Sequence, residues 1–150
     1  MFRGSHHAKI DEKGRLKVPA GFKALVDEEH VKEFYVTSVT GEFAEIWPLP
    51  AWRAREDRLA VMSEFDDSAR KYLTRTSHWG QEVEMDAQAR MVLPQKLRSS
   101  AVLDEVEVTV VGMRDHIEVH NRKKFEAALN AEEFTAEDRK AMAELFRRKE

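Results

Sequence analysis

The sequence predicts an α+β fold, mainly β, in which two tandem copies of one small module share a single core. Three observations predict it: a duplicated motif, short strands in which apolar and polar residues alternate, and helical segments that follow each copy. The chain has 150 residues, of which 42% are hydrophobic. Since a copy of roughly 50 residues buries too little apolar surface to fold alone, we expect both copies to contribute to one core.

Two blocks of the sequence recur in the same order. The segment 8–19, AKIDEKGRLKVP, resembles the segment 83–94, VEMDAQARMVLP. A second, shorter match lies farther along each half of the chain. The aligned residues are Asp11, Arg15 and Pro19 with Asp86, Arg90 and Pro94, and then Glu45, Ile46 and Trp52 with Glu118, Val119 and Phe125. Two matches in one order indicate a duplicated module.

Each copy predicts the same succession of elements. Two short strands with a period of two are joined by a tight turn, a proline starts a short helix, and a hairpin follows. In the first copy these elements are strands 7–11 and 15–18, helix 19–26, and strands 34–39 and 43–47. In the second copy they are strands 82–86 and 90–93, helix 94–100, and strands 106–112 and 116–120.

Helical segments are expected to join and extend the two copies. The segment 50–65 places Trp52, Leu59 and Met62 on one stripe, and the linker 66–79 has Tyr72 and Leu73 as apolar anchors. The resulting division is 7–53 for module 1, 54–80 for the helical linker, 81–124 for module 2 and 125–150 for the C-terminal helices.

The C-terminal helices have recognisable start signals. Asn121 is a favourable N-cap, and Thr135 with Asp138 resembles a capping box. After this box, one helical face is apolar. It consists of Ala141, Met142, Leu145 and Phe146. We expect this face to dock onto the two modules rather than to bind a partner.

Charge differs between the two copies, although the net charge is only −3. The outward and turn positions of the first copy hold Lys9, Lys13, Arg15 and Lys17, and the matching positions of the second copy hold Glu84, Gln88, Arg90 and Val92. Four cations on one hairpin repel one another, so an anionic partner such as nucleic acid would explain them. Lysines also solvate exposed strands and prevent edge aggregation, and charge alone leaves both explanations open.

Several separated motifs resemble the MraZ family, which belongs to the AbrB-like group of swapped-hairpin barrels. They are the opening MFRG, the block IDEKGRLKVP at 10–19, the duplicated Asp-x-x-x-Arg-x-x-x-Pro and the stretch WPLPAW at 47–52. The resemblance implies two AbrB-like modules in a shared, pseudo-symmetric β-barrel. It also implies a cytoplasmic, nucleoid-associated transcriptional repressor of the division and cell-wall gene cluster. Such a regulator would bind short direct repeats in double-stranded promoter DNA as a ring-like homo-oligomer.

Within that resemblance, each residue of the basic hairpin has an expected role. Arg15 can bind guanine O6 and N7 together, whereas phosphates suit the other cations. These cations are Lys9, Lys13, Lys17 and Arg3. Asp11 and Asp86 should accept backbone N–H groups in the turns, because a carboxylate repels phosphate.

The second turn departs from the family pattern. Gly14 can adopt a positive φ freely, but Ala89 stands at the matching position. The second turn should therefore be either less tightly bent or strained, which leaves the role of Arg90 as an equal DNA reader open.

The residues also allow two other classes of function. For an enzyme, Glu42 with Glu45 and Asp115 with Glu118 could form carboxylate pairs, and the histidines could be ligands, His116 and His120 above all. No catalytic motif accompanies them, so we expect no enzyme, cofactor, metal site or small-molecule substrate. The other class is an antitoxin-like interaction module with the helix at 132–150 as its arm. The chain has no cysteine and no apolar run long enough for a membrane span, so we expect no disulfide and no membrane partner.

Overall fold

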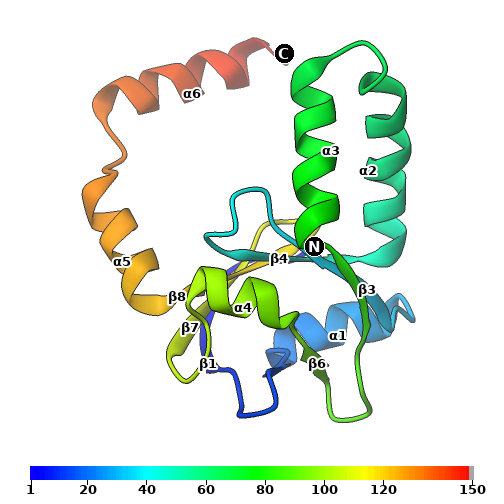
Figure 1. Cartoon of the computed structure of the whole chain (residues 1–150). Coiled ribbons are helices and arrows are strands. Elements are labelled where there is room, and N and C mark those ends of the chain that lie inside the picture. The colour runs from blue at the N-terminus through cyan, green and yellow to red at the C-terminus, as the bar shows by residue number, and fades with distance from the viewer. Residues whose placement is uncertain (149–150) are drawn as a thin grey trace.

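The computed structural model describes residues 1–148 and shows a six-stranded antiparallel sheet, a separate two-stranded sheet and six helices among them (Figure 1). The strands are β1 (Ser5–Lys9), β2 (Arg15–Lys17), β3 (Glu33–Thr37), β4 (Ala44–Pro48), β5 (Gln81–Glu84), β6 (Arg90–Val92), β7 (Glu107–Gly112) and β8 (Ile117–Asn121). The helices are α1 (Ala20–Glu28), α2 (Leu49–Met62), α3 (Asp67–Trp79), α4 (Gln95–Ala101), α5 (Arg122–Ala131) and α6 (Ala136–Arg148). The predicted α+β class is confirmed.

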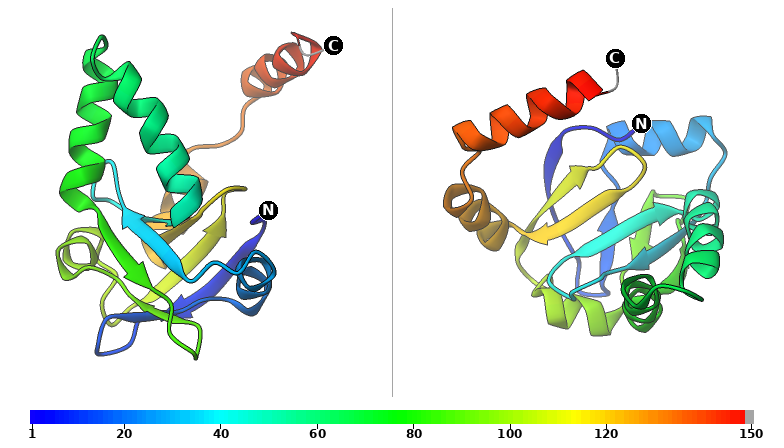
Figure 2. Two further views of the ribbon diagram at one scale, coloured as in Figure 1. Left: turned by 90° about the vertical axis from the view of Figure 1, so that its right-hand side faces the viewer. Right: turned by 90° about the horizontal axis from the view of Figure 1, so that it is seen from above.

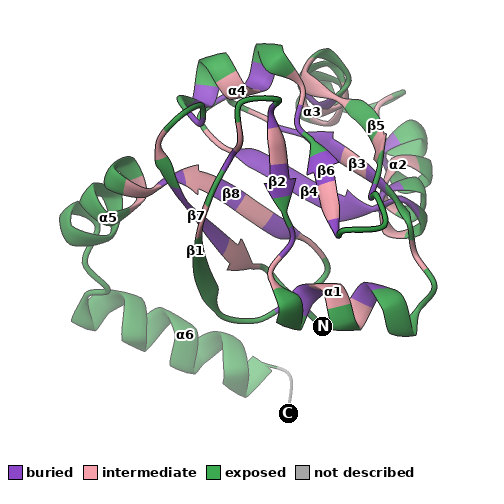
Figure 3. Cartoon of the chain, turned by 90° about the horizontal axis from the view of Figure 1, so that it is seen from below, coloured by how far each residue is buried: buried purple, intermediate pink, exposed green. Residues whose placement is uncertain are grey.

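The two copies exchange their leading hairpins. The large sheet has the order β1-β7-β8-β4-β3-β5, so β1 of the first copy pairs with β7 of the second, and β5 of the second pairs with β3 of the first. The second strands of the two hairpins, β2 and β6, pair with each other and lie in front of the large sheet when it is seen from below (Figure 3). Neither copy can complete its sheet alone.

One hydrophobic cluster joins the two copies, as the sequence predicts. Leu16 and Val36 of the first copy are fully buried in it together with Met91, Leu97 and Val108 of the second. The alternation along the leading strands explains this burial, because every second side chain of a strand points to the same face. The shared core holds both hairpin turns at one end of the barrel (Figures 1 and 2).

The helices α2 and α3 project from the barrel as an antiparallel pair (Figure 2). Trp52 and Leu59 are buried, but Met62, expected on the same stripe, is half exposed because the far end of the pair leaves the sheet. The segment 66–79, which the sequence predicts to be helical, contains α3. Its carbonyl at Thr76 accepts hydrogen bonds from the hydroxyls of Tyr35 (3.1 Å) and Thr37 (2.7 Å), which fix α3 to β3.

The capping signals act where the sequence places them. The Asn121 side chain accepts the N–H of Lys124 (3.0 Å) at the start of α5. Thr135 and Asp138 bond reciprocally: Asp138 N–H donates to the Thr135 hydroxyl (3.1 Å), and Thr135 N–H donates to the Asp138 carboxylate (2.9 Å). Pro19 and Pro94, in contrast, are N-caps with extended ψ rather than first helical residues.

The predicted docking of the apolar face of α6 onto the modules is wrong. Every residue of α6 is exposed, and the helix departs from the body of the protein after α5 (Figures 1 and 2). The capping box gives α6 its own start signal, so the helix forms without contact with the core. The predicted boundaries at 53 and 124 fall inside α2 and α5, and residues 149–150 of the predicted C-terminal segment lie outside the described residues.

Candidate nucleic-acid interface

The turn between β1 and β2 is organised by one carboxylate. Asp11 Oδ1 accepts the backbone N–H groups of Lys13 (3.0 Å) and Arg15 (2.8 Å), and Oδ2 accepts Arg15 Nε–H (2.7 Å). The Gly14 N–H closes the turn on the Asp11 carbonyl (2.9 Å). The backbone hydrogen bond from Arg15 is the main reason why the pKa of Asp11 is lowered, so the carboxylate stays ionised.

The turn between β5 and β6 repeats this arrangement. Asp86 accepts the N–H groups of Gln88 and Arg90 (both 2.9 Å) and Arg90 Nε–H (3.0 Å), and its pKa is lowered mainly by the backbone bond from Arg90. Ala89 has φ +61°, close to the +78° of Gly14. Of the two possibilities left open by the sequence, the turn is therefore strained rather than less tightly bent.

Each arginine keeps part of its hydrogen-bonding capacity. Arg15 and Arg90 are both half-buried, and both use Nε for the carboxylate of their own turn. The end edge of each guanidinium, formed by its two terminal amino groups, is separate from the Nε–H that makes this bond, because a guanidinium is a rigid planar fork. The Asp–Arg pair thus holds the fork in one orientation at the end of the barrel.

Strand pairing brings the cations of the two copies together. Lys17 lies directly opposite Arg90, and Arg15 lies opposite Val92, because β2 and β6 are antiparallel neighbours. When each hairpin is considered by itself, Arg90 has only acidic and neutral neighbours, and its position opposite Lys17 is missed. No local pattern could have indicated it, since a period of two does not identify the partner strand.

Two predicted phosphate-binding cations lie apart from this group. Lys9 is opposite Glu107 in the pairing of β1 with β7, so its neighbourhood is partly acidic. Arg3 precedes β1 at the end opposite the turn, and five residues separate it from Lys9. Lys13, at the tip of the turn, is exposed beside Arg15 and Lys17. The structure therefore groups Lys13, Arg15 and Lys17 with Arg90.

Arg98 supports the first turn from below, a role that the sequence did not suggest. A Cβ on Gly14 would lie only 2.5 Å from Cζ of the Arg98 guanidinium. Nε donates to the Leu93 carbonyl (2.8 Å), and Nη1 donates to Asp104 (2.7 Å). Gly14 is therefore required both for its positive φ and for this close approach.

Most of the residues considered for catalysis take part in contacts within the protein, whereas Glu42 lines a surface pocket. The Glu45 carboxylate accepts Trp47 Nε1–H (3.0 Å), and His116 stacks on Trp47 at 4.1 Å. Burial raises the pKa of Glu45. Burial by itself opposes ionisation of Glu118, but hydrogen bonds from His116 and His120 lower its pKa to about 2.

His116 and His120 belong to the same group of polar side chains as Glu45 and Glu118. Burial would lower the pKa of His116, but its hydrogen bonds to Glu118 and Asp115 outweigh it and raise the pKa. His120 bonds Glu118 at 2.9 Å. Within residues 1–148, no three histidine, aspartate or glutamate side chains converge as a metal ion would require. Over the same residues, no helix combines the length and the apolar character of a membrane span.

Comparison with known proteins identifies relatives over nearly the whole chain. The family model described as "MraZ protein, putative antitoxin-like" matches residues 1–75 and 80–146. A protein of Acidobacterium capsulatum named transcriptional regulator MraZ is 45% identical over 144 residues, which are 96% of this chain and 98% of that protein. A protein of Koribacter versatilis with the same name is 38% identical, over 97% of this chain and 99% of its own length.

Proposed function

We propose that this chain, which belongs to the MraZ family, is a transcriptional regulator that binds promoter DNA through the paired turns at one end of its barrel. The observation that carries the proposal is the group formed by Arg15, Lys17 and Arg90 on the paired strands β2 and β6, with Lys13 exposed on the turn that precedes β2. In finer detail, the chain would bind short direct repeats as a ring-like homo-oligomer and repress the division and cell-wall gene cluster.

The geometry of Arg15 suits base recognition. Because Nε is bonded to Asp11, the two terminal amino groups remain to donate to guanine O6 and N7 in the major groove. The carboxylate keeps the guanidinium oriented before DNA arrives, so less side-chain entropy is lost on binding. Lys13 and Lys17, with mobile ammonium groups, suit phosphates on either side of the contacted base.

The two lysines and Arg15 offer only a few contacts, so one copy would bind DNA weakly. Several copies at fixed spacing would add their contacts, because each turn after the first binds at a high effective concentration. Direct repeats in the DNA would match such an array. Both turns lie at one end of the barrel, which leaves the other surfaces free for contacts between copies (Figure 1).

Arg15→Ala and Arg90→Ala are a matched pair for testing this function. Both substitutions remove the same Nε–carboxylate bond from the same kind of turn, so their effects on folding should be similar. The first copy has more cations around its turn, so Arg15→Ala should remove the preference for operator over scrambled DNA, and Arg90→Ala should reduce it less. One bidentate base contact corresponds to about 1–3 kcal/mol, or about 5–150-fold in the affinity ratio.

The measurement is a salt titration of operator and scrambled DNA binding, with the oligomer mass checked in parallel. Lys13→Ala should weaken binding to both DNAs alike and reduce the slope of log affinity against log salt by about one per turn in contact. Equal loss of specificity from Arg15→Ala and Arg90→Ala, at unchanged mass, would show that both turns read bases and that the charge difference between the copies is irrelevant.

A further inference from the structure

The helix α6 carries an apolar face that no residue within 1–148 covers. Met142, Leu145 and Phe146 are 37%, 51% and 67% exposed. Leu129 and Phe134 extend the surface back to α5, with 60% and 61% exposure. Scattered exposed apolar residues are normal, but a contiguous apolar face on a helix marks a site of contact with another protein surface.

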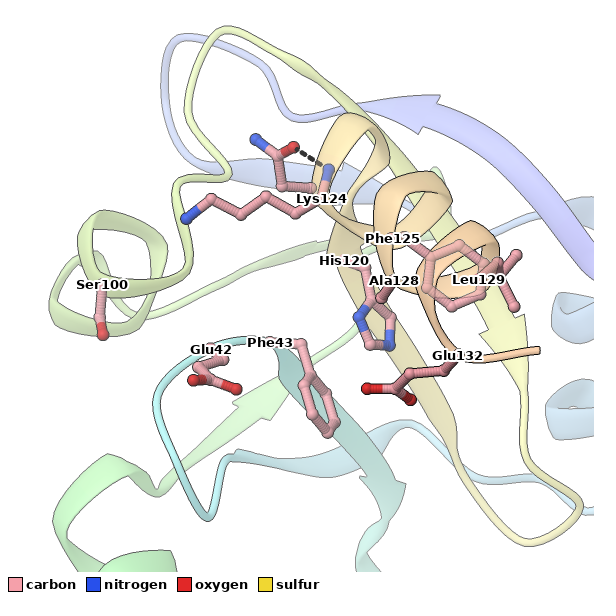
Figure 4. Close-up of a pocket in the computed structure, with 10 residues that line it drawn as sticks. Glu42, Phe43, Ser100, His120, Lys124, Phe125, Ala128, Leu129 and Glu132 are labelled. Atoms are coloured by element: carbon pink, nitrogen blue, oxygen red, sulfur yellow. Dashed lines mark hydrogen bonds between the residues drawn. The ribbon is translucent and has the colours of Figure 1, made fainter. Parts of the chain in front are cut away.

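A preformed pocket lies between α5 and the connection from β3 to β4 (Figure 4). Its volume is about 440 Å³. Its aromatic wall is rigid: His120 stacks on Phe43 (4.4 Å between ring centroids), contacts Phe125 (4.7 Å) and is held by a hydrogen bond to Glu118 (2.9 Å). Leu129, an exposed apolar residue of α5, stands at its edge (Figure 4).

Charge distinguishes this pocket from the other exposed apolar groove. Glu42 and Glu132 line the pocket, with Lys124 at the end nearer Ser100 (Figure 4). On α6, helical spacing places Arg139 and Arg148 on the two borders of the apolar face. The groove on α2 contains Met62 and Leu59, but Arg55 and Arg58 line it against the single acid Asp57, so it would repel those arginines.

We propose that α6 of one copy docks into this pocket of a second copy. Leu145 and Phe146 would enter between the aromatic side chains, while Arg139 and Arg148 would lie beside Glu42 and Glu132. Helix and pocket are different surfaces, so each copy offers one of each, and such head-to-tail contacts close into a ring when the rotation between neighbours allows it. This deepens the assembly part of the proposed function and leaves both DNA-facing turns free.

The alternative is that α6 folds back and binds the pocket of its own chain. The connection 132–135 is short, and folding back would create an αα-hairpin of α5 and α6. In the structure α6 instead leaves α5, and all of its residues are exposed (Figure 1). A second copy can therefore meet the apolar face of α6 without a change in the connection 132–135.

The test separates the two destinations by complementation. Met142→Gln/Phe146→Gln removes the apolar face of α6, and Ala128→Arg fills the pocket with a cation at an exposed helical position. Lys140→Gln/Glu144→Gln is the control, because it changes the opposite face of the same helix at the same spacing and keeps the net charge. Glutamine and arginine are good helix formers, so all variants should fold, which circular dichroism checks.

Light scattering should give wild type and the control a mass several times 17.4 kDa. The α6 variant and the pocket variant should each have the mass of one chain. An equimolar mixture of these two variants should contain a species of two chains, because one intact helix and one intact pocket remain between them. A mixture that stays monomeric, or single variants that keep the wild-type mass, would overturn the proposal.

DNA binding is measured on the same samples so that the two proposals fail separately. Monomeric variants should retain weak, salt-dependent binding to a single repeat and lose the gain in affinity on DNA with several repeats. If wild type itself is a monomer, the assembly part of the proposed function fails. If wild type is an oligomer and both variants keep its mass, only the docking of α6 into the pocket fails.

Discussion

Substituting Gly14 with alanine should destabilise the protein far more than the reverse exchange at Ala89. Both residues occupy the same left-handed turn position, at φ +78° and +61°. An L-residue with a side chain costs about 1–2 kcal/mol in that region. Gly14→Ala also reduces the conformational entropy of the unfolded chain, which offsets about 0.4–1 kcal/mol of this destabilisation. From backbone terms alone, the loss would be about 1 kcal/mol or less.

Arg98 makes the first turn more sensitive. A Cβ on Gly14 would lie 2.5 Å from Arg98 Cζ and 2.7 Å from Nε, so the guanidinium must move. That side chain is only 14% exposed and is bonded to the Leu93 carbonyl and Asp104. Weakening two such bonds costs about 1–3 kcal/mol. The expected total for Gly14→Ala is therefore about 1–4 kcal/mol.

Ala89→Gly should change stability by less than about 1 kcal/mol. Relief of strain is offset by the larger unfolded-state entropy and by loss of a buried methyl group worth about 0.8 kcal/mol. Urea unfolding at one fixed protein concentration measures both variants, and Gly21→Ala, in α1 with open space around it, is the control. If Gly14→Ala is no worse than Ala89→Gly, then Arg98 does not constrain the first turn and the reasoning is refuted.

Four further perturbations test other parts of the fold. Asn121→Ala should cost about 1–3 kcal/mol in the same urea assay, because this side chain both caps α5 and donates to the Val102 carbonyl (2.8 Å). Asp66→Ala is the control: it removes only a cap on α3 and should cost about 1 kcal/mol or less. The lowered pKa of Glu118 contributes stability that is present above pH 4.5 and is lost as the pH falls toward about 2, so Glu118→Gln should flatten the pH dependence of unfolding in that window and Glu133→Gln should not. The raised pKa of His116 acts in the opposite sense: its contribution to stability is complete below pH 6.5 and disappears as the pH rises through the raised value. Comparing the free energy of unfolding of His116→Gln with that of wild type between pH 6 and 9 would detect this loss. Cleavage of the linker near Ser77 should leave both halves unfolded or aggregated, because β1 and β5 each pair with the other half, and a half that unfolds cooperatively on its own would contradict the shared core.

Local features of the fold could be read from the sequence alone. The duplicated motif identified two copies, alternation identified which side chains of the leading strands are buried, and Asn121 and Thr135 marked helix starts that the structure contains. These features depend on neighbours within about four residues, for which spacing and side-chain chemistry are sufficient information. They place the turns, and the cations of the first turn, without any knowledge of tertiary contacts.

Only the tertiary structure decided which surfaces those local elements form. The pairing of β2 with β6 joins residues 73 to 77 positions apart and sets Lys17 opposite Arg90, so the cations of the two copies form one group. The close approach of Arg98 to Gly14 and the exposure of α6 are likewise results of three-dimensional packing. An amphipathic pattern predicts that one face of a helix is covered, but it does not identify the surface that covers it. Apolar contact is non-directional, so the partner of that face depends on the path of the whole chain.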